Sequence, residues 1–364
     1  AAALRAGGDN PTPPPVARFE RPTSLDFVCV NNGEVVARKR CRAGAAGEFA
    51  LHALVTQSAR GEIAAVDLAK QKVLDSRRDI PGFTYVAAGE LPIAIVVPAR
   101  HPWVTYVADF GGRDIRVLDT QALVSPTSID PTLQVIHLGS GPTHMVLSPD
   151  EDALLVTLPD VGRVLWLPIN RLTERCAVGD RKCPEGLINE ADKVSIELAG
   201  SIDRVVPPAP TPTGASYQEL CGFERTAPAP ALPISLPAPG SDAAPLPSPA
   251  GLALDAFCGG ARNCQRRLLV ADEAGPLIHR IDLDAITPGG NGEDALLAPI
   301  VVGVPTSAVA VTPFVPTAVR ETGATQYIYA IDATDGSILV VENGVVLNLD
   351  NAPGVRPDRI RLPG

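Results

Sequence analysis

Residues 89–120 read GELPIAIVVPARHPWVTYVADFGGRDIRVLDT, and their pattern decides the fold. A proline leads into a short apolar strand, a second strand ends in Ala-Asp, a glycine turn follows, and a third strand ends in Asp. Short apolar runs separated by glycine and proline are typical of β-strands joined by tight turns. The stretch therefore predicts consecutive antiparallel strands, and its pattern occurs at four other places in the chain.

Five copies of this pattern align at corresponding positions. A proline precedes the first strand of each copy, at Pro22, Pro92, Pro142, Pro249 and Pro305. The second strand ends at Thr56, Asp109, Thr157, Asp272 and Asp332, and the third strand ends at Asp67, Asp119, Pro168, Asp282 and Glu342. A glycine separates these two strands in each copy, at Gly61, Gly112, Gly162, Gly275 and Gly336.

The recurring glycines and acids are interpreted as structural. The five glycines are expected to supply the positive φ angle that tight hairpin turns need. Asp67, Asp119 and Asp282 are expected to accept hydrogen bonds from turn amides. Their recurrence argues against catalysis, because one active site does not need an acid in every unit.

A repeat of about 50 residues with four short antiparallel strands is typical of a β-propeller blade. One blade cannot bury both of its faces alone, so blades stack around an axis and share a core. The predicted fold is therefore an all-β propeller with four-stranded antiparallel blades. Five blades are readable, and six or seven are expected if the ring is complete.

Within these units the chain resembles the YVTN-type propeller repeat of the lactonase-like propeller superfamily. Tyr106, Val107 and Asp109 match the second strand of that repeat, with Asp at the Asn position. Residues 148–150 match its Ser-Pro-Asp turn, and Glu151 replaces the glycine that follows. The resemblance implies a propeller of a secreted or lipid-anchored bacterial protein, and it says little about function.

The propeller is expected to span residues 22–349, after a Pro- and Gly-rich lead at 1–21 and before a connector or closing strand at 350–364. Residues 199–247 interrupt the repeat and form either a degenerate blade or a surface insertion. The insertion is favoured, because proline this dense cannot lie in central strands. The same stretch, an N-terminal strand VARFERP, or residues beyond the supplied C-terminus are the alternatives for completing the ring.

Six of the seven cysteines bracket short loops, as the pairs Cys29 and Cys41, Cys176 and Cys183, and Cys258 and Cys264. None forms a C-x-x-C pair or lies near a histidine at zinc spacing, so local disulfides are expected rather than a metal site. Disulfides place the protein in an oxidising compartment. Cys221 is left over, as a buried thiol, an intermolecular bond or a sign of different pairing.

The formal net charge of -10 disfavours nucleic acid or an anionic membrane surface as a partner. No apolar run approaches the roughly 20 residues that span a bilayer. The lead at 1–21 could remain after signal cleavage or tether a lipoprotein whose modified cysteine lies upstream of Ala1; a disordered cytoplasmic terminus is the alternative. The expected location is extracytoplasmic in a bacterium: periplasmic, outer-membrane-associated or secreted.

No motif assigns a catalytic, cofactor-binding or metal-binding residue. His144 could line the central channel, Asp332 and Asp335 resemble half a calcium loop, and the basic cluster at 37–42 could be a docking patch; a structural role is favoured for each. The preferred hypothesis is a non-catalytic binding or structural module, without a cofactor, in a cell-envelope or extracellular protein assembly. The alternative, on fold analogy alone, is a periplasmic propeller enzyme such as a lactonase-like hydrolase or an amine or quinoprotein dehydrogenase-type subunit.

Overall fold

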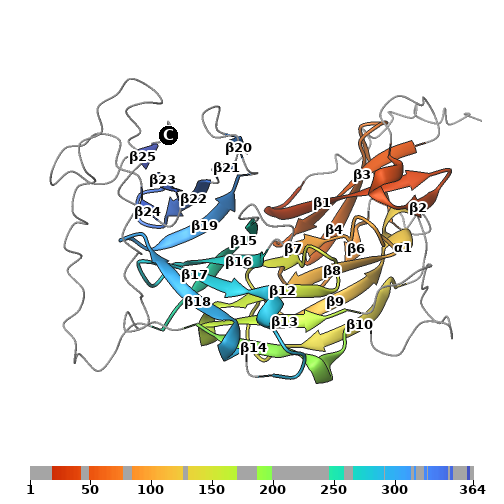
Figure 1. Cartoon of the computed structure of the whole chain (residues 1–364). Coiled ribbons are helices and arrows are strands. Elements are labelled where there is room, and N and C mark those ends of the chain that lie inside the picture. Colours follow the sequence, from red (N-terminus) through yellow and green to blue (C-terminus); the bar gives the residue numbers. More distant parts are fainter. Residues whose placement is uncertain are drawn as a thin grey trace, which may run out of the picture.

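The computed structural model describes residues 19–41, 49–76, 84–125, 130–169, 187–198, 246–257, 265–290, 292–312, 315–316, 324–325, 327–342, 345–346 and 359–360. Within these ranges the chain forms five main antiparallel sheets, one after another along the sequence. They are arranged around an arc in Figure 1, with the first and fifth sheets at its two ends. This architecture confirms the predicted all-β propeller fold.

The second sheet contains the stretch that predicted the repeat. Its strands are β7 (Pro92–Val96), β8 (Val104–Asp109), β9 (Asp114–Asp119) and β10 (Thr132–His137), in the order β10-β9-β8-β7. A short helix, α1 (Thr120–Val124), follows β9, and Asp119 caps it by accepting a hydrogen bond from the Gln121 amide. Both faces of β8 are buried, as expected for a strand packed between neighbouring blades.

The third and fourth sheets repeat this sequential order. The third contains β11 (Met145–Leu147), β12 (Ala153–Leu158), the 3-10 turn η2 (Pro159–Val161), β13 (Arg163–Pro168), η3 (Glu190–Asp192) and β14 (Val194–Glu197). The fourth contains β15 (Pro249–Phe257), β16 (Gln265–Asp272), β17 (Leu277–Asp282), η5 (Leu283–Ala285), η6 (Glu293–Ala295) and β18 (Leu296–Val301).

The first sheet departs from the four-strand pattern at both of its edges. It contains β1 (Pro22–Asn31), β2 (Glu34–Val36), β3 (Phe49–Gln57), β4 (Glu62–Asp67), β5 (Lys72–Val73) and β6 (Val86–Ala87), and the 3-10 turn η1 (Arg38–Arg40) follows β2. β2 forms a hairpin with β1 and pairs with the edge of β1 that faces away from β3. At the other side of the sheet, β5 and β6 both pair with β4 and together take the fourth-strand position.

The fifth sheet is also completed in two pieces. It contains β19 (Thr306–Val311), β22 (Tyr327–Asp332), β23 (Ile338–Glu342), β24 (Val345–Val346) and β25 (Arg359–Ile360); β20 (Val315–Pro316) pairs separately with β21 (Ala324–Thr325). β25 lies within the predicted C-terminal connector and pairs with β23. The described part of 350–364 therefore extends the fifth sheet.

Packing joins each sheet to the next along the chain. Val28 and Leu54 of the first sheet share a buried cluster with Ile95 of the second, and Leu155 of the third shares one with Leu268 of the fourth. Burying a side chain of this size contributes about 1.5–3 kcal/mol. β15 packs on β11 and β12, and β19 packs on β15 and β16, whereas no comparable packing joins the described strands of the fifth and first sheets.

The repeat glycines fall into two groups, which corrects one expectation. Gly61, Gly162 and Gly336 have positive φ angles of 67°, 62° and 71°. Gly112 and Gly275 do not, so the predicted reason for a glycine is wrong at these two positions. A Cβ atom there would lie 2.6 Å and 2.8 Å from carboxylate oxygens of Asp109 and Asp272. Close approach of a buried carboxylate therefore requires glycine in these turns.

Candidate functional site

The loops that follow the inner strands of the first three sheets meet at one end of the propeller. The first of them carries the basic turn η1, which a disulfide between Cys29 and Cys41 fastens to β1, with 5.7 Å between the two Cα atoms. This bond is one of the three pairings expected from the sequence. Cys176, Cys183, Cys258, Cys264 and Cys221 lie outside the described residues.

Arg38 connects η1 to both neighbouring inner strands. Its guanidinium Nη2 donates to Asp26 Oδ1 at 2.7 Å and to the Phe27 carbonyl at 2.9 Å. Its backbone amide donates to the carbonyl of Ala99, in the loop between β7 and β8, at 2.8 Å. The other carboxylate oxygen of Asp26 accepts from the Val97 amide at 2.7 Å. Two of these four hydrogen bonds hold η1 to β1, and the other two hold η1 and β1 against the second sheet.

Glu151 connects the second sheet to the third. It lies in the β11–β12 turn with φ of 57°, in the left-handed region that the glycine of the repeat would normally occupy. Its carboxylate accepts from the Ala99 amide at 2.9 Å and from the Arg100 amide at 3.1 Å. A non-glycine residue at such an angle costs free energy and persists only where surrounding contacts hold it. Here those contacts fix the backbone of the neighbouring loop.

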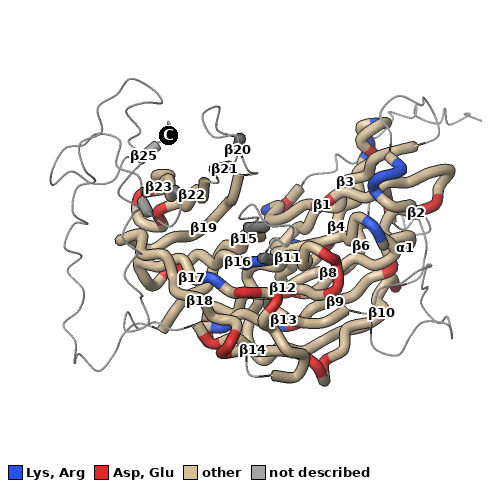
Figure 2. The backbone as a smooth tube through the Cα atoms, in the orientation of Figure 1, with Lys and Arg blue, Asp and Glu red and all other residues tan. Residues whose placement is uncertain are grey.

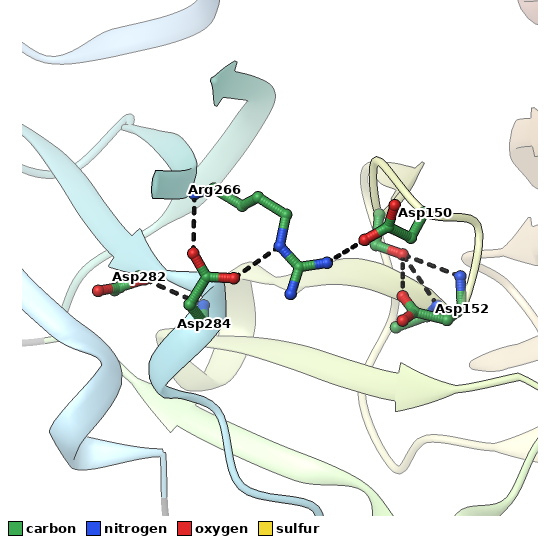
Figure 3. Close-up of polar contacts among 7 residues, drawn as sticks. Asp150, Asp152, Arg266, Asp282 and Asp284 are labelled. Atoms are coloured by element: carbon green, nitrogen blue, oxygen red, sulfur yellow. Dashed lines mark hydrogen bonds and ion pairs between the residues drawn. The ribbon is translucent and has the colours of Figure 1, made fainter. Parts of the chain in front are cut away.

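Arg266 connects the third sheet to the fourth, and Figure 3 shows it between two acids. Its guanidinium bonds Asp150 of the β11–β12 turn, and its Nε donates to Asp284 Oδ1 at 2.6 Å. The Arg266 amide also donates to Asp284 at 3.1 Å. Burial would raise the pKa of Asp284, but these bonds from Arg266 outweigh it and hold that pKa below its ordinary value.

These contacts form a continuous polar chain across four sheets, which we call the loop belt. The loop belt consists of Asp26, Arg38, Ala99, Arg100, Asp150, Glu151, Arg266 and Asp284. Ser148 supports it, because its hydroxyl donates to Asp152 at 2.5 Å and accepts from the Ala153 amide at 3.0 Å. The loop belt therefore presents several loops as one fixed surface.

Exposed cations project from this end of the molecule. Lys39, Arg40 and Arg100 are exposed, and the His101 ring lies beside Trp103 with 5.8 Å between ring centroids. The buried atoms Arg38 Nε and His101 Nδ1 have no hydrogen-bond partner among the described residues. Buried polar atoms usually find a partner, so these two nitrogens are exceptions within the described part of the chain.

The acids singled out in the sequence lie apart from one another, each in its own sheet. Asp67 accepts from the Lys70 amide at 3.1 Å, Asp119 from the Gln121 amide at 3.0 Å, and Asp282 from the Asp284 amide at 3.0 Å. Each bond stabilises the turn that follows a third strand. The structure therefore does not bring these acids together into one site.

Two buried histidines also contact acids within single sheets. His279 Nε2 lies 3.0 Å from Asp272 Oδ2, and the Ser248 amide donates to the same carboxylate at 2.8 Å. Burial opposes ionisation of Asp272, but the bonds from His279 and from backbone amides outweigh it and lower its pKa. His52 lies 3.9 Å from Asp67. His144, expected to be able to line the channel, lies just before β11 and is exposed.

Two features of the described ranges bear on membranes and metals. No helix in them is both long and apolar enough to cross a bilayer. No group of three or more His, Cys, Asp or Glu side chains in them is placed to hold a metal ion. Asp332, part of the half calcium loop seen in the sequence, instead accepts from the Thr334 amide at 2.8 Å.

Sequence reasoning found the basic turn but missed the loop belt. Arg266 and Asp150 are 116 residues apart, and no short-range pattern links them. The replacement of the turn glycine by Glu151 was visible in the sequence, and it was the one available signal. A charged residue at a left-handed position implies that its side chain has a partner, although the sequence does not say which.

Comparisons with known proteins give weak structural likenesses and no sequence match. No family model and no curated protein matches the chain. Similar solved structures include the β-propeller domain of Cps50 (Swd1) from Myceliophteria thermophila, with 8% identity, a TM-score of 0.43, and coverage of 80% of this chain and 66% of that one.

Two further structures show the same level of likeness. A Bacteroides fragilis protein provisionally named a 6-phosphogluconolactonase has 12% identity and a TM-score of 0.44, with coverage of 91% of this chain and 70% of that one. BBS1N, solved in complex with ARL6DN, has 11% identity and a TM-score of 0.42, with coverage of 88% and 60%. Values this low assign no family, substrate or partner to the chain.

Proposed function

We propose that the protein is a non-catalytic binding or structural module of a bacterial extracytoplasmic protein assembly. The loop belt is the observation that carries this proposal. It holds loops from four sheets in fixed positions while leaving charged side chains exposed above them. Preorganised loops on a rigid scaffold lose little conformational entropy when they bind a partner.

The location outside the cytoplasm is supported by the disulfide between Cys29 and Cys41, since such bonds persist in oxidising compartments. We propose the same state for the pairs Cys176–Cys183 and Cys258–Cys264. A YVTN-type ancestry and a lipid anchor upstream of Ala1 are further proposals, which rest on the sequence resemblance and on the Pro- and Gly-rich lead. The net charge of -10 makes a protein partner more favourable than nucleic acid.

The enzymatic alternative rests on fold analogy alone. The acids with described contacts at the strand ends are engaged by backbone amides, as Asp109 is by the amides of Glu90 and Leu91. Two backbone amides fix the Asp109 side chain in place, which suits a structural role. We therefore assign these acids to the scaffold in the proposed function.

The test is to isolate the tagged full-length protein from its native cell envelope under mild conditions. The proposal predicts a stoichiometric complex that elutes together in size exclusion and is recovered again when the partner carries the tag. Recovery as a monomer that hydrolyses a lactone or oxidises an amine would overturn it. Mass mapping without reduction would separately test the two remaining disulfides.

A further inference from the structure

We propose that the exposed cations beside the loop belt form a docking site for a short acidic peptide segment of a partner protein. The site consists of Lys39 and Arg40 in η1 and Arg100 in the β7–β8 loop. This inference rests on the proposed function and deepens it by naming the chemistry of the partner. Figure 2 shows Lys and Arg gathered at the end of the first sheet, near β2 and α1.

The three cations are held close together by their backbones. The hydrogen bond from the Arg38 amide to the Ala99 carbonyl, 2.8 Å long, places Arg100 beside η1. The Cys29–Cys41 disulfide fixes η1 from one side, and Glu151 fixes the Arg100 amide from the other. Binding therefore requires ordering of the side chains but not of the loops that carry them.

The local charge is positive although the protein is acidic overall. Lys39, Arg40 and Arg100 take part in no ion pair with another described residue. The neighbouring acids are already engaged: Asp26 binds Arg38, and Glu151 binds backbone amides. The exposed Glu34 on β2 offsets only one of the three charges.

The chemistry of the exposed side chains favours a carboxylate ligand. Guanidinium and ammonium groups only donate hydrogen bonds, and the oxygens of an ionised carboxylate only accept them. Arginine guanidinium groups also bind carboxylates with two parallel hydrogen bonds, which gives Arg40 and Arg100 a geometric preference for such groups.

The overall charge favours a short segment over an extended anionic surface. At physiological ionic strength, charges more than about 8 Å apart are largely screened from one another. A short peptide over the site therefore experiences mainly the local cations. A membrane or a nucleic acid would extend over the acidic remainder of the molecule, whose formal net charge is -10, and would be repelled.

The experiment measures binding of a fluorescently labelled peptide of alternating Glu and Gly to the full chain by anisotropy at low salt. We expect saturable binding that weakens as salt is added. The triple variant Lys39→Glu, Arg40→Glu, Arg100→Glu should bind at least about tenfold more weakly, since reversed charges repel the ligand. Lys39→Gln with Arg40→Gln is a second variant, expected to be intermediate and less perturbing to folding.

The control variant is Lys193→Glu, at an exposed lysine between η3 and β14. This substitution changes the net charge by the same amount as Lys39→Glu. It should leave peptide affinity within about twofold. The site would be overturned if Lys193→Glu lowered peptide affinity as much as Lys39→Glu alone. It would also be overturned if the wild type did not bind the peptide. Stronger binding to phosphatidylglycerol vesicles than to the peptide would overturn it in favour of a membrane. If the triple variant still formed the native complex, the partner would not dock at this site, and the proposed function would stand.

Discussion

At the scale of single residues, a hydrogen-bond acceptor lies at the end of the second strand in several sheets. It is a threonine hydroxyl in some sheets and an aspartate carboxylate in others. Thr56 Oγ1 accepts from the Ser24 amide at 2.9 Å, and Thr157 Oγ1 accepts from the His144 amide at 2.8 Å. Asp109 plays the corresponding part with two amides, at 2.8 Å and 2.7 Å. Both threonine and aspartate suit this position, because each offers a short side-chain oxygen that reaches the start of the first strand.

The Asp109 carboxylate should be the most costly of these acceptors to remove. It is fully buried, and Asp109→Ala leaves the amides of Glu90 and Leu91 unpaired. We expect a loss of about 2–4 kcal/mol in the free energy of unfolding, because each hydrogen bond to a charged group contributes about 1.5–3 kcal/mol. Urea unfolding followed by circular dichroism measures this loss. Asp130→Ala, at an exposed acid that also accepts an amide bond, is the control and should lose less than about 1 kcal/mol.

His52 should make the protein less stable in mild acid. Its side chain is 7% exposed, and burial lowers its pKa, an effect that nearby Asp67 only partly offsets. The unfolded chain therefore binds this proton more tightly than the folded one, so stability falls as the pH drops below the ordinary histidine value of about 6.5. His52→Gln should show a smaller stability difference between neutral and mildly acidic solution. An unchanged difference would assign the acid sensitivity to other groups.

At the scale of elements, the β11–β12 turn combines a strained backbone with bonds to the neighbouring sheet. Glu151→Ala loses the two amide bonds and keeps a side chain in the left-handed region. Glu151→Gly loses the same bonds but removes the strain. The free energy of unfolding of the Glu151→Gly variant should therefore exceed that of Glu151→Ala by about 1 kcal/mol. Thermal and urea unfolding of the two variants measure this difference. Equal stability would mean that the turn relaxes to another conformation when the carboxylate is lost.

The strands that the sequence predicted well are those with a local signature. β8 and β9 end at the acids that marked them, and a glycine turn separates them as expected. The fourth-strand positions of the first and fifth sheets have no such signature, because each is built from two short segments with little periodicity of their own. The loop belt could not be predicted, since its bonds join turns that only the packing of sheets brings together.

At the scale of the whole molecule, stability comes from packing between consecutive sheets. β15 lies directly against β11 and β12, so the third and fourth sheets are neighbours in space although residues 199–245 separate them in sequence. Leu155 and Leu268, both fully buried, belong to the shared core. In such a repeat architecture each interface between sheets contributes separately to the free energy of unfolding. A long connection between two sheets is tolerated if its ends lie close together, because the entropy cost of closing a loop grows slowly with its length.

The two ends of the connection at 199–245 do lie close together. The Leu198 amide donates to the Gly162 carbonyl at 3.0 Å, and a Cβ atom on Gly162 would lie 3.1 Å from the Pro247 carbonyl oxygen. A Gly/Ser linker of about eight residues, with a typical end-to-end distance of roughly 15 Å, is therefore long enough to replace 199–245.

We expect the shortened protein to fold and to gain about 1–2 kcal/mol in the free energy of unfolding, because a shorter loop costs less entropy to close. Urea unfolding compares it with the full chain. Leu268→Asp in the full chain is the reference for a broken core and should unfold. If the shortened protein instead loses cooperative unfolding to the same extent as Leu268→Asp, residues 199–247 are part of the fold, as a degenerate blade would be. Retained cooperativity would identify them as an insertion carried by the third and fourth sheets.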